Sequence, residues 1–142
     1  MTNLELVKAF FAGAPDDLVA AIEDPEWVAI VKQGLAPLIA PDFEFVTVRQ
    51  SVGFPGAKRG VDGFVTAYRA YAEMWESYSL KPQQFVEVGD KVVVEAKISG
   101  TTRTGGVPLE QDVAAVYTFE DGRIRRIEEF SDLASAHAAA SA

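Results

Sequence analysis

The sequence predicts an α+β domain in which helices come first and a mostly antiparallel sheet follows. Apolar residues recur at helical spacing as far as Pro37, whereas they alternate at a period of two over most of the second half. The turn at Gly89-Asp90 and the pair Asp121-Gly122, a strong hairpin signal, separate strands there. The length of 142 residues suits one core, and we take 1–142 as a single domain.

Composition excludes several classes of site. The chain lacks cysteine, which excludes disulfides, thiolate metal sites and a cysteine nucleophile, and its single histidine argues against a zinc site or a Ser-His-Asp triad. A net charge of −8 argues against binding to nucleic acid. We expect no metal and no organic cofactor.

The expected location is the cytoplasm. No apolar run approaches the length of a membrane span, so we expect no membrane partner. The N-terminal stretch MTNLELVKAFF lacks the basic region of a secretory signal. Hydrophobic residues make up 49% and charged residues 24%, as is typical of a globular protein.

Three short helices are expected at the start. The first begins at a capping box, TNLE, and ends before Gly13. The second covers 18–22. A cap followed by proline, Asp24-Pro25, opens the third. The third has an apolar face made of Trp27, Ile30, Val31 and Leu35.

A strand, FEFVTVRQ, follows from Phe43, and a long helix begins near Asp62. This helix is expected to carry YRAYAEMWESY and to end before Pro82. Its aromatic face consists of Phe64, Tyr68, Tyr71, Trp75 and Tyr78. We interpret Phe64 and Trp75 as packing residues and the tyrosines as possible ligand contacts.

Four strands should form an antiparallel meander: QFVEV, KVVVEAKISGTTRT, LEQDVAAVYTF and RIRRIEEFS. The last segment, 132–142, is expected to be a short helix that frays, and His137 within it is assigned no chemical role.

Three stretches in this order, GVDGFVTAYRAYAEMWESY, VGDKVVVEAKISGTT and VYTFEDGRIRRIEEFSD, resemble the SnoaL-like branch of the nuclear transport factor 2-like superfamily. The resemblance spans nearly the whole chain. It implies a cystatin-like cone, in which N-terminal helices pack in a curved, mostly antiparallel sheet that encloses an apolar pocket. It also implies a homodimer paired through the sheet, for which Val92 and Val94 would supply an apolar face.

The catalytic residues of ketosteroid isomerase, an enzyme of this fold, do not carry over. Its tyrosine, its aspartate base and its protonated aspartate would fall on Phe10, Thr47 and Ala115. The aspartate of SnoaL-type cyclases would also fall on Ala115. The nearest acid, Asp112, has the opposite strand orientation.

Limonene epoxide hydrolase, which the chain also resembles, leaves one candidate. Its Arg-x-Asp pair would fall on Ala96 and Ile98, but its other aspartate would fall at Glu129. A lone carboxylate cannot both activate water and protonate an epoxide. Glu129 is therefore our candidate catalytic residue, because a carboxylate that faces an apolar pocket is a typical general acid or base.

The expected pocket face of the last strand is Arg125, Ile127 and Glu129, and that of its neighbour is Val113, Ala115, Tyr117 and Phe119. Arg49 could serve as a counter-ion to Glu129, and tyrosine hydroxyls could orient a ligand. The expected ligand-binding residues are Tyr68, Tyr71, Trp75, Arg49, Tyr117 and Ile127.

Two functions remain open. One is a cofactor-independent isomerase, cyclase or epoxide-hydrolase-like enzyme that acts on a small cyclic or polyketide-like substrate by general acid–base chemistry. The other is a non-catalytic ligand-binding or accessory protein. Both would bind a small hydrophobic molecule in an apolar pocket.

Overall fold

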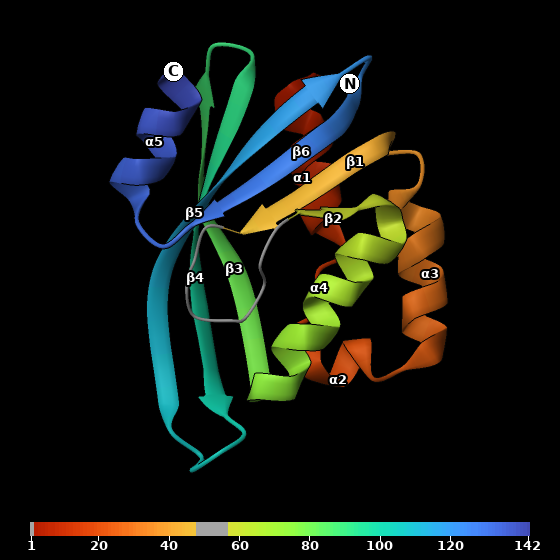
Figure 1. Cartoon of the computed structure of the whole chain (residues 1–142), viewed down its shortest axis with the longest axis vertical. Helices are drawn as coiled ribbons and strands as arrows, with labels where there is room; N and C mark the ends of the chain where they lie inside the picture. The colour runs from red at the N-terminus through yellow and green to blue at the C-terminus, as the bar shows by residue number, and fades with distance from the viewer. Residues whose placement is uncertain (1, 48–56) are drawn as a thin grey trace.

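The computed structural model describes residues 2–47 and 57–142. Its elements are α1 (Asn3–Ala12), α2 (Leu18–Ile22), α3 (Pro25–Leu35), β1 (Ile39–Thr47), β2 (Ala57–Arg59), α4 (Gly60–Met74), β3 (Trp75–Val88), β4 (Lys91–Thr102), β5 (Pro108–Glu120), β6 (Arg123–Phe130) and α5 (Leu133–Ser141). The strands form one sheet in the order β2-β1-β6-β5-β4-β3, and only β1 and β6 run parallel. Figure 1 shows α1 to α4 on one face of the sheet and α5 on the other.

The helix starts that the sequence predicts are confirmed. The Thr2 hydroxyl accepts a hydrogen bond from the backbone N–H of Glu5 at 3.1 Å, and the Glu5 carboxylate accepts one from the backbone of Thr2 at 3.2 Å. Asp24 caps α3 by accepting from the backbone N–H of Glu26 at 3.0 Å. Each cap satisfies a backbone donor that has no partner inside its helix.

The single long helix expected through Tyr78 is wrong. Helix α4 ends at Met74, and Trp75 begins β3, which pairs with β4 along its whole length. The backbone at the junction finds partners in the turn after β4. There the Arg103 guanidinium donates to the carbonyls of Ala72 and Trp75 at 2.9 and 3.1 Å. Pairing with a distant strand therefore overrides the local helical spacing.

The two faces of β4 carry different cores. Val92 and Val94 face α1 to α4 and are each 1% exposed, while Val93 lies under α5. The expectation that Val92 and Val94 present an apolar face to a second copy is therefore wrong. Strand alternation puts them inside the cone, since the helices cover that face.

The C-terminal segment forms a helix that packs on the sheet. Asp132 caps α5, and Ala136 and Ala140 are buried against the convex face in one apolar cluster with Val93, Ala114 and Val116. The ring of His137, to which we gave no chemical role, lies 2.9 Å from the Glu95 carboxylate of β4. Small side chains allow this close approach of helix and sheet, which the tail's composition alone did not indicate.

A bulge changes the orientation of one residue expected to face the pocket. Phe119 lies opposite Ile124, the ladder then skips Arg125, and pairing resumes at Arg126. Ile124 is fully buried in the core, whereas Arg125 forms an ion pair with Asp42 at 3.1 Å. The expectation that Arg125 faces the pocket is therefore wrong.

None of the helices in residues 2–47 and 57–142 combines the length and the hydropathy that a membrane span needs.

Candidate functional site

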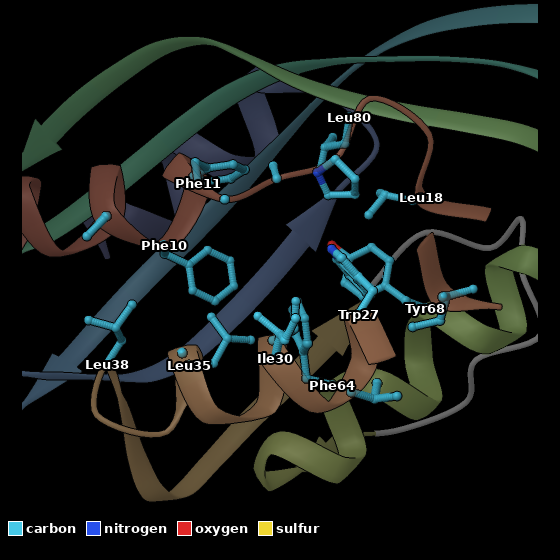
Figure 2. Close-up of a pocket in the computed structure, with 18 residues that line it drawn as sticks. Phe10, Phe11, Leu18, Trp27, Ile30, Leu35, Leu38, Phe64, Tyr68 and Leu80 are labelled. Carbon is cyan, nitrogen blue, oxygen red and sulfur yellow. The ribbon is translucent and has the colours of Figure 1, made fainter. Parts of the chain in front are cut away.

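An apolar cavity of about 260 Å³ lies between α1, α2, α3 and α4 (Figure 2). We call it the interhelical pocket. The apolar face predicted for the third helix, made of Trp27, Ile30, Val31 and Leu35, contributes to its wall. Ile30 remains 61% exposed, so this face borders a cavity rather than a filled core. The helical spacing identified the face correctly but did not reveal what it borders.

A second, smaller cavity lies deeper, against the concave face of the sheet. We call it the inner chamber. Its volume is about 20 Å³, close to that needed for one water molecule. Residues from five strands line it, including Phe45, Leu80, Val94, Ala115, Tyr117, Ile127 and Glu129. Ile127, Glu129 and Tyr117 all line this chamber, and their roles in binding or catalysis stay predictions.

Within the described part of the chain, Glu129 is the one charged residue that is buried, with 5% of its surface exposed. It lies opposite Ala115 of β5 and opposite Thr47 of β1. β6 is flanked on both sides by other strands, which places Glu129 away from the sheet edges. A carboxylate held in such an apolar setting is the typical arrangement of a general acid or base.

Tyr117 shares the inner chamber with Glu129. Burial raises the pKa of the Tyr117 phenol well above its usual range, and the negative charge of Glu129 raises it further. The phenol therefore stays protonated and can donate a hydrogen bond. Together the two residues place a proton acceptor and a hydroxyl donor in one buried chamber.

Aromatic side chains separate the two cavities. The interhelical pocket and the inner chamber share Phe10, Phe11, Phe64, Tyr68 and Leu80 as lining residues. Glu129 and Tyr117 line only the inner chamber. The larger cavity and the candidate catalytic residue are thus neighbours, divided by a layer of rings.

The other predicted ligand-binding residues are placed differently. Tyr68 lines both cavities, and so does Phe64, which we expected only to pack. Trp75 lies on β3, where its ring packs at 5.3 Å from that of Tyr78, and it is not among the described residues that line either cavity. Arg49 and the side chain of Tyr71 lie outside the described part of the structure.

Residues that we did not single out as ligand contacts form much of the pocket wall. Phe10 and Phe11 come from α1, Leu18 from α2 and Trp27 from α3. Their signal in the sequence is the apolar face of each short helix, which is also the signal of ordinary packing. Sequence spacing does not distinguish a face that lines a cavity from one that fills a core.

Polar contacts hold the helices of the pocket in place. The Asp17 carboxylate accepts from the backbone N–H of Val19 at 3.0 Å, as the cap of α2, and from the backbone N–H of Tyr78 in β3 at 3.2 Å. The Lys32 ammonium lies 2.9 Å from the Asp62 carboxylate and joins α3 to α4. The pocket is therefore framed by helices attached to the sheet and to each other.

The described residues contain no group of three or more histidine, aspartate or glutamate side chains that could hold a metal ion. The interhelical pocket can bind an apolar molecule, and the pair Glu129 and Tyr117 can exchange a proton with a bound group.

Three solved structures similar to this chain each cover at least 97% of it. A nuclear transport factor 2-like protein from Burkholderia thailandensis is 26% identical, with a TM-score of 0.71. The match covers 100% of this chain and 98% of that protein's chain. TerC, co-crystallised with polyporic acid, is 25% identical, with a TM-score of 0.69 and coverage of 99% and 98%. A protein of ketosteroid isomerase-like fold from Catenulispora acidiphila, in complex with trimethylamine, is 20% identical, with a TM-score of 0.63 and coverage of 97% and 92%.

No curated protein sequence matches the chain. The sequence model of the SnoaL-like domain matches residues 16–127, which span α2 to β6. The match includes three of the four helices around the interhelical pocket, and it ends inside β6, before Glu129. This protein therefore belongs to the SnoaL-like domain family, a branch of the nuclear transport factor 2-like superfamily whose fold binds small molecules.

Proposed function

We propose that the protein binds a small, neutral, largely aromatic molecule in the interhelical pocket. The observation that carries this proposal is the cavity of about 260 Å³ between four helices, with Ile30 left 61% exposed beside it. A large apolar side chain exposed at the wall of a cavity is a common feature of ligand sites.

The volume limits the size of the ligand. A dry apolar cavity of about 150 Å³ holds one benzene ring. The interhelical pocket, at about 260 Å³, therefore fits a molecule of two fused rings better than a single ring. We take 2-naphthol as the probe.

The wall also limits the polarity of the ligand. Among the described residues that line the pocket there is no lysine, arginine or histidine, which disfavours an anionic ligand. The hydroxyl of Tyr68 and the indole N–H of Trp27 are the polar groups of the aromatic wall. The ligand of TerC, polyporic acid, supports a small organic molecule as the class of ligand.

Tryptophan indole signals in ¹H–¹⁵N NMR spectra test the proposal, because the chain has two tryptophans. Trp27 lines the pocket and Trp75 does not. We expect 2-naphthol to shift the Trp27 signal in a saturable manner, with a Kd on the order of 10–100 μM, or about 0.6 kcal/mol per non-hydrogen atom. The Trp75 signal, assigned with Trp75→Phe, should move little.

A matched pair of variants locates the binding. Gly34 lines the pocket, and a Cβ added there meets no atom within 4 Å, so Gly34→Leu should fill the cavity and abolish binding. Gln33→Leu adds the same side chain at the next, exposed position of α3 and should leave the Kd unchanged. Unchanged affinity in Gly34→Leu would show that the probe binds elsewhere.

A second candidate function is proton-transfer catalysis, favoured by the burial of Glu129 beside Tyr117. Here Glu129 would carry the proton and the Tyr117 hydroxyl would stabilise a developing negative charge on the substrate. The reaction class would be isomerisation or cyclisation of a small cyclic compound. Epoxide opening would need a second donor, a role open to Tyr117.

Turnover separates this candidate from a binding protein. Enones, lactones and epoxides of about two rings are incubated with wild type, Glu129→Gln and Glu128→Gln, whose altered side chain lies on the convex face. An enzyme should lose activity by roughly 10²–10⁴-fold in Glu129→Gln alone. Binding without turnover in the wild type favours the non-catalytic reading.

The homodimer and the cytoplasmic location stay predictions. Sedimentation equilibrium tests the dimer directly, and a monomer at high concentration would contradict it. Fractionation of the native host tests the location.

A further inference from the structure

Phe10 stands between the two cavities. Its ring comes from α1 and meets Phe64 of α4 at 5.5 Å and Tyr117 of β5 at 5.9 Å, edge to face in both cases. Figure 2 shows the ring extending into the space between the helices. Phe64 lines both cavities and Tyr117 lines only the inner chamber. Phe10 therefore contacts a residue of the interhelical pocket and a residue of the chamber that contains Glu129.

We propose that Phe10 sets the length of ligand that the protein accepts, because its ring closes the inner end of the interhelical pocket against the chamber of Glu129 and Tyr117. This inference rests on the proposed binding of a small aromatic molecule in that pocket. Beyond that proposal, it identifies Phe10 as the residue that determines specificity, and it names the chemical class of the longer ligands that Phe10 excludes.

The other rings between the cavities make different ring contacts. Phe64 and Tyr68 pack on each other at 4.7 Å and both pack on Phe45 of the sheet, at 5.9 and 6.0 Å. Phe11 is held by Phe85 at 6.0 Å as well as by Phe10 and Tyr117. Among the described ring contacts, Phe10 is the ring that meets both Phe64 of α4 and Tyr117 of β5.

Loss of the Phe10 ring would join the two cavities into one elongated site. The far end of that site would carry the carboxylate of Glu129 and the hydroxyl of Tyr117. A buried carboxylate is stabilised by a hydrogen-bond donor, so the ligand that fits has an apolar body and a hydroxyl at its tip. Linear aryl phenols or enols of about three rings are the corresponding class.

The test compares 2-naphthol with the longer 6-phenyl-2-naphthol, using the Trp27 indole signal as readout. The variants are Phe10→Ala and Phe85→Ala, a matched control because Phe85 belongs to the same aromatic cluster and lines neither cavity. We expect Phe10→Ala to bind the longer probe at least roughly tenfold more tightly than wild type does, through burial of the extra ring. Affinity for 2-naphthol should not rise with it, because Phe10→Ala removes one ring from the wall that this probe contacts, so the ratio of the two affinities is the readout.

A second comparison tests contact with Glu129. In Phe10→Ala, 6-phenyl-2-naphthol should bind more tightly than 2-phenylnaphthalene, which lacks the hydroxyl. The difference should shrink in the double variant Phe10→Ala/Glu129→Gln, because the amide is a weaker acceptor than the carboxylate. Wild type should not show this dependence on Glu129, since its Phe10 ring blocks the approach.

Phe10→Leu is included because Phe10→Ala could fail to fold, and circular dichroism checks the fold of both. Leucine leaves a smaller barrier and should give an intermediate preference for the longer probe. Suppose that 2-naphthol binds wild type but that Phe10→Ala and Phe85→Ala change the affinities for the two probes equally. The proposed role of Phe10 is then wrong, whereas the proposal that the pocket binds a small aromatic molecule stands. If 2-naphthol leaves the Trp27 signal of wild type unchanged, the proposed function is wrong and this inference falls with it.

Discussion

The phenol of Tyr117 is kept protonated by its burial and, to a smaller extent, by the negative charge of Glu129. The two residues lie on adjacent strands, where Tyr117 is opposite Ile127 and Glu129 is opposite Ala115. Both side chains point to the concave face and line the inner chamber. This relationship gives the candidate site a measurable electrostatic signature.

Replacement of Glu129 should lower the pKa of Tyr117. Burial is the larger cause of the raised pKa, so in Glu129→Gln the Tyr117 pKa should fall but remain above the usual value of 10.0. Titration of ¹³Cζ-labelled tyrosine by NMR follows each of the four tyrosines separately. Glu128→Gln, on the opposite face, is the control, and an equal shift in both variants would contradict the arrangement.

The same pKa shift predicts how stability depends on pH. A group whose pKa is raised in the folded state contributes stability that is complete below its unfolded pKa and is lost as the pH rises above it. The free energy of unfolding should therefore decline above pH 10, the ordinary pKa of tyrosine, with a contribution from Tyr117. Urea unfolding between pH 9 and 11 should show a shallower decline in Tyr117→Phe, and identical slopes would contradict this.

Asp17 should contribute more to stability than Asp24, although both cap a helix. Among the described contacts, Asp24 accepts from α3 alone, whereas Asp17 accepts from α2 and from the backbone of Tyr78 in β3. We expect Asp17→Ala to cost about 1–3 kcal/mol and Asp24→Ala about 0.5–1 kcal/mol. Urea denaturation measures both, and Asp17→Asn, which keeps an oxygen acceptor, should recover part of the loss.

Gly100 should not tolerate a side chain. A Cβ there would overlap the carbonyl oxygen of Ser77 in β3 and lie 3.0 Å from the ring of Trp75. Because backbone atoms would have to move, Gly100→Ala should destabilise the protein by about 1–3 kcal/mol. Gly34→Ala, with open space around the added Cβ in α3, should instead be neutral or stabilising by up to about 1 kcal/mol. Equal unfolding midpoints would show that β3 adapts.

Helix α5 should detach when a charge is placed on its buried face. Ala136 is fully buried against the convex face, whereas Ala138 on the same helix is exposed. Ala136→Asp should therefore cost about 1–3 kcal/mol and increase amide hydrogen exchange throughout α5, with little effect from Ala138→Asp. Unchanged protection in Ala136→Asp would mean that α5 contributes little to the fold.

Much of the fold could be predicted from local signals. The capping box at Thr2, the cap at Asp24 and the Asp121-Gly122 turn each depend on residues within one turn of chain. Strand alternation also predicted that Ile127 and Glu129 face the same side as Tyr117. It failed at Arg125 because a bulge adds a residue to the strand, and no local signal marks that position.

The helix-to-strand change at Trp75 depended on distant residues. The aromatic residues from Phe64 to Tyr78 fit a helical face, but the second part of this stretch pairs with β4 instead. Pro82 is tolerated inside β3 because this strand lies at the edge of the sheet, where one side of its backbone needs no partner. Neither fact can be read from the stretch itself.

The sequence by itself determined the α+β class and the orientation of Glu129, because these follow from spacing and from short-range turns, and its resemblance to known members determined the SnoaL-like family. Only the tertiary structure decided where the cavities lie. Four helices with similar apolar faces leave a cavity between them, while aromatic rings from α1 and α4 nearly fill the space beside Glu129. Periodicity states which side chains point inward, but only packing determines whether they meet one another or surround a void.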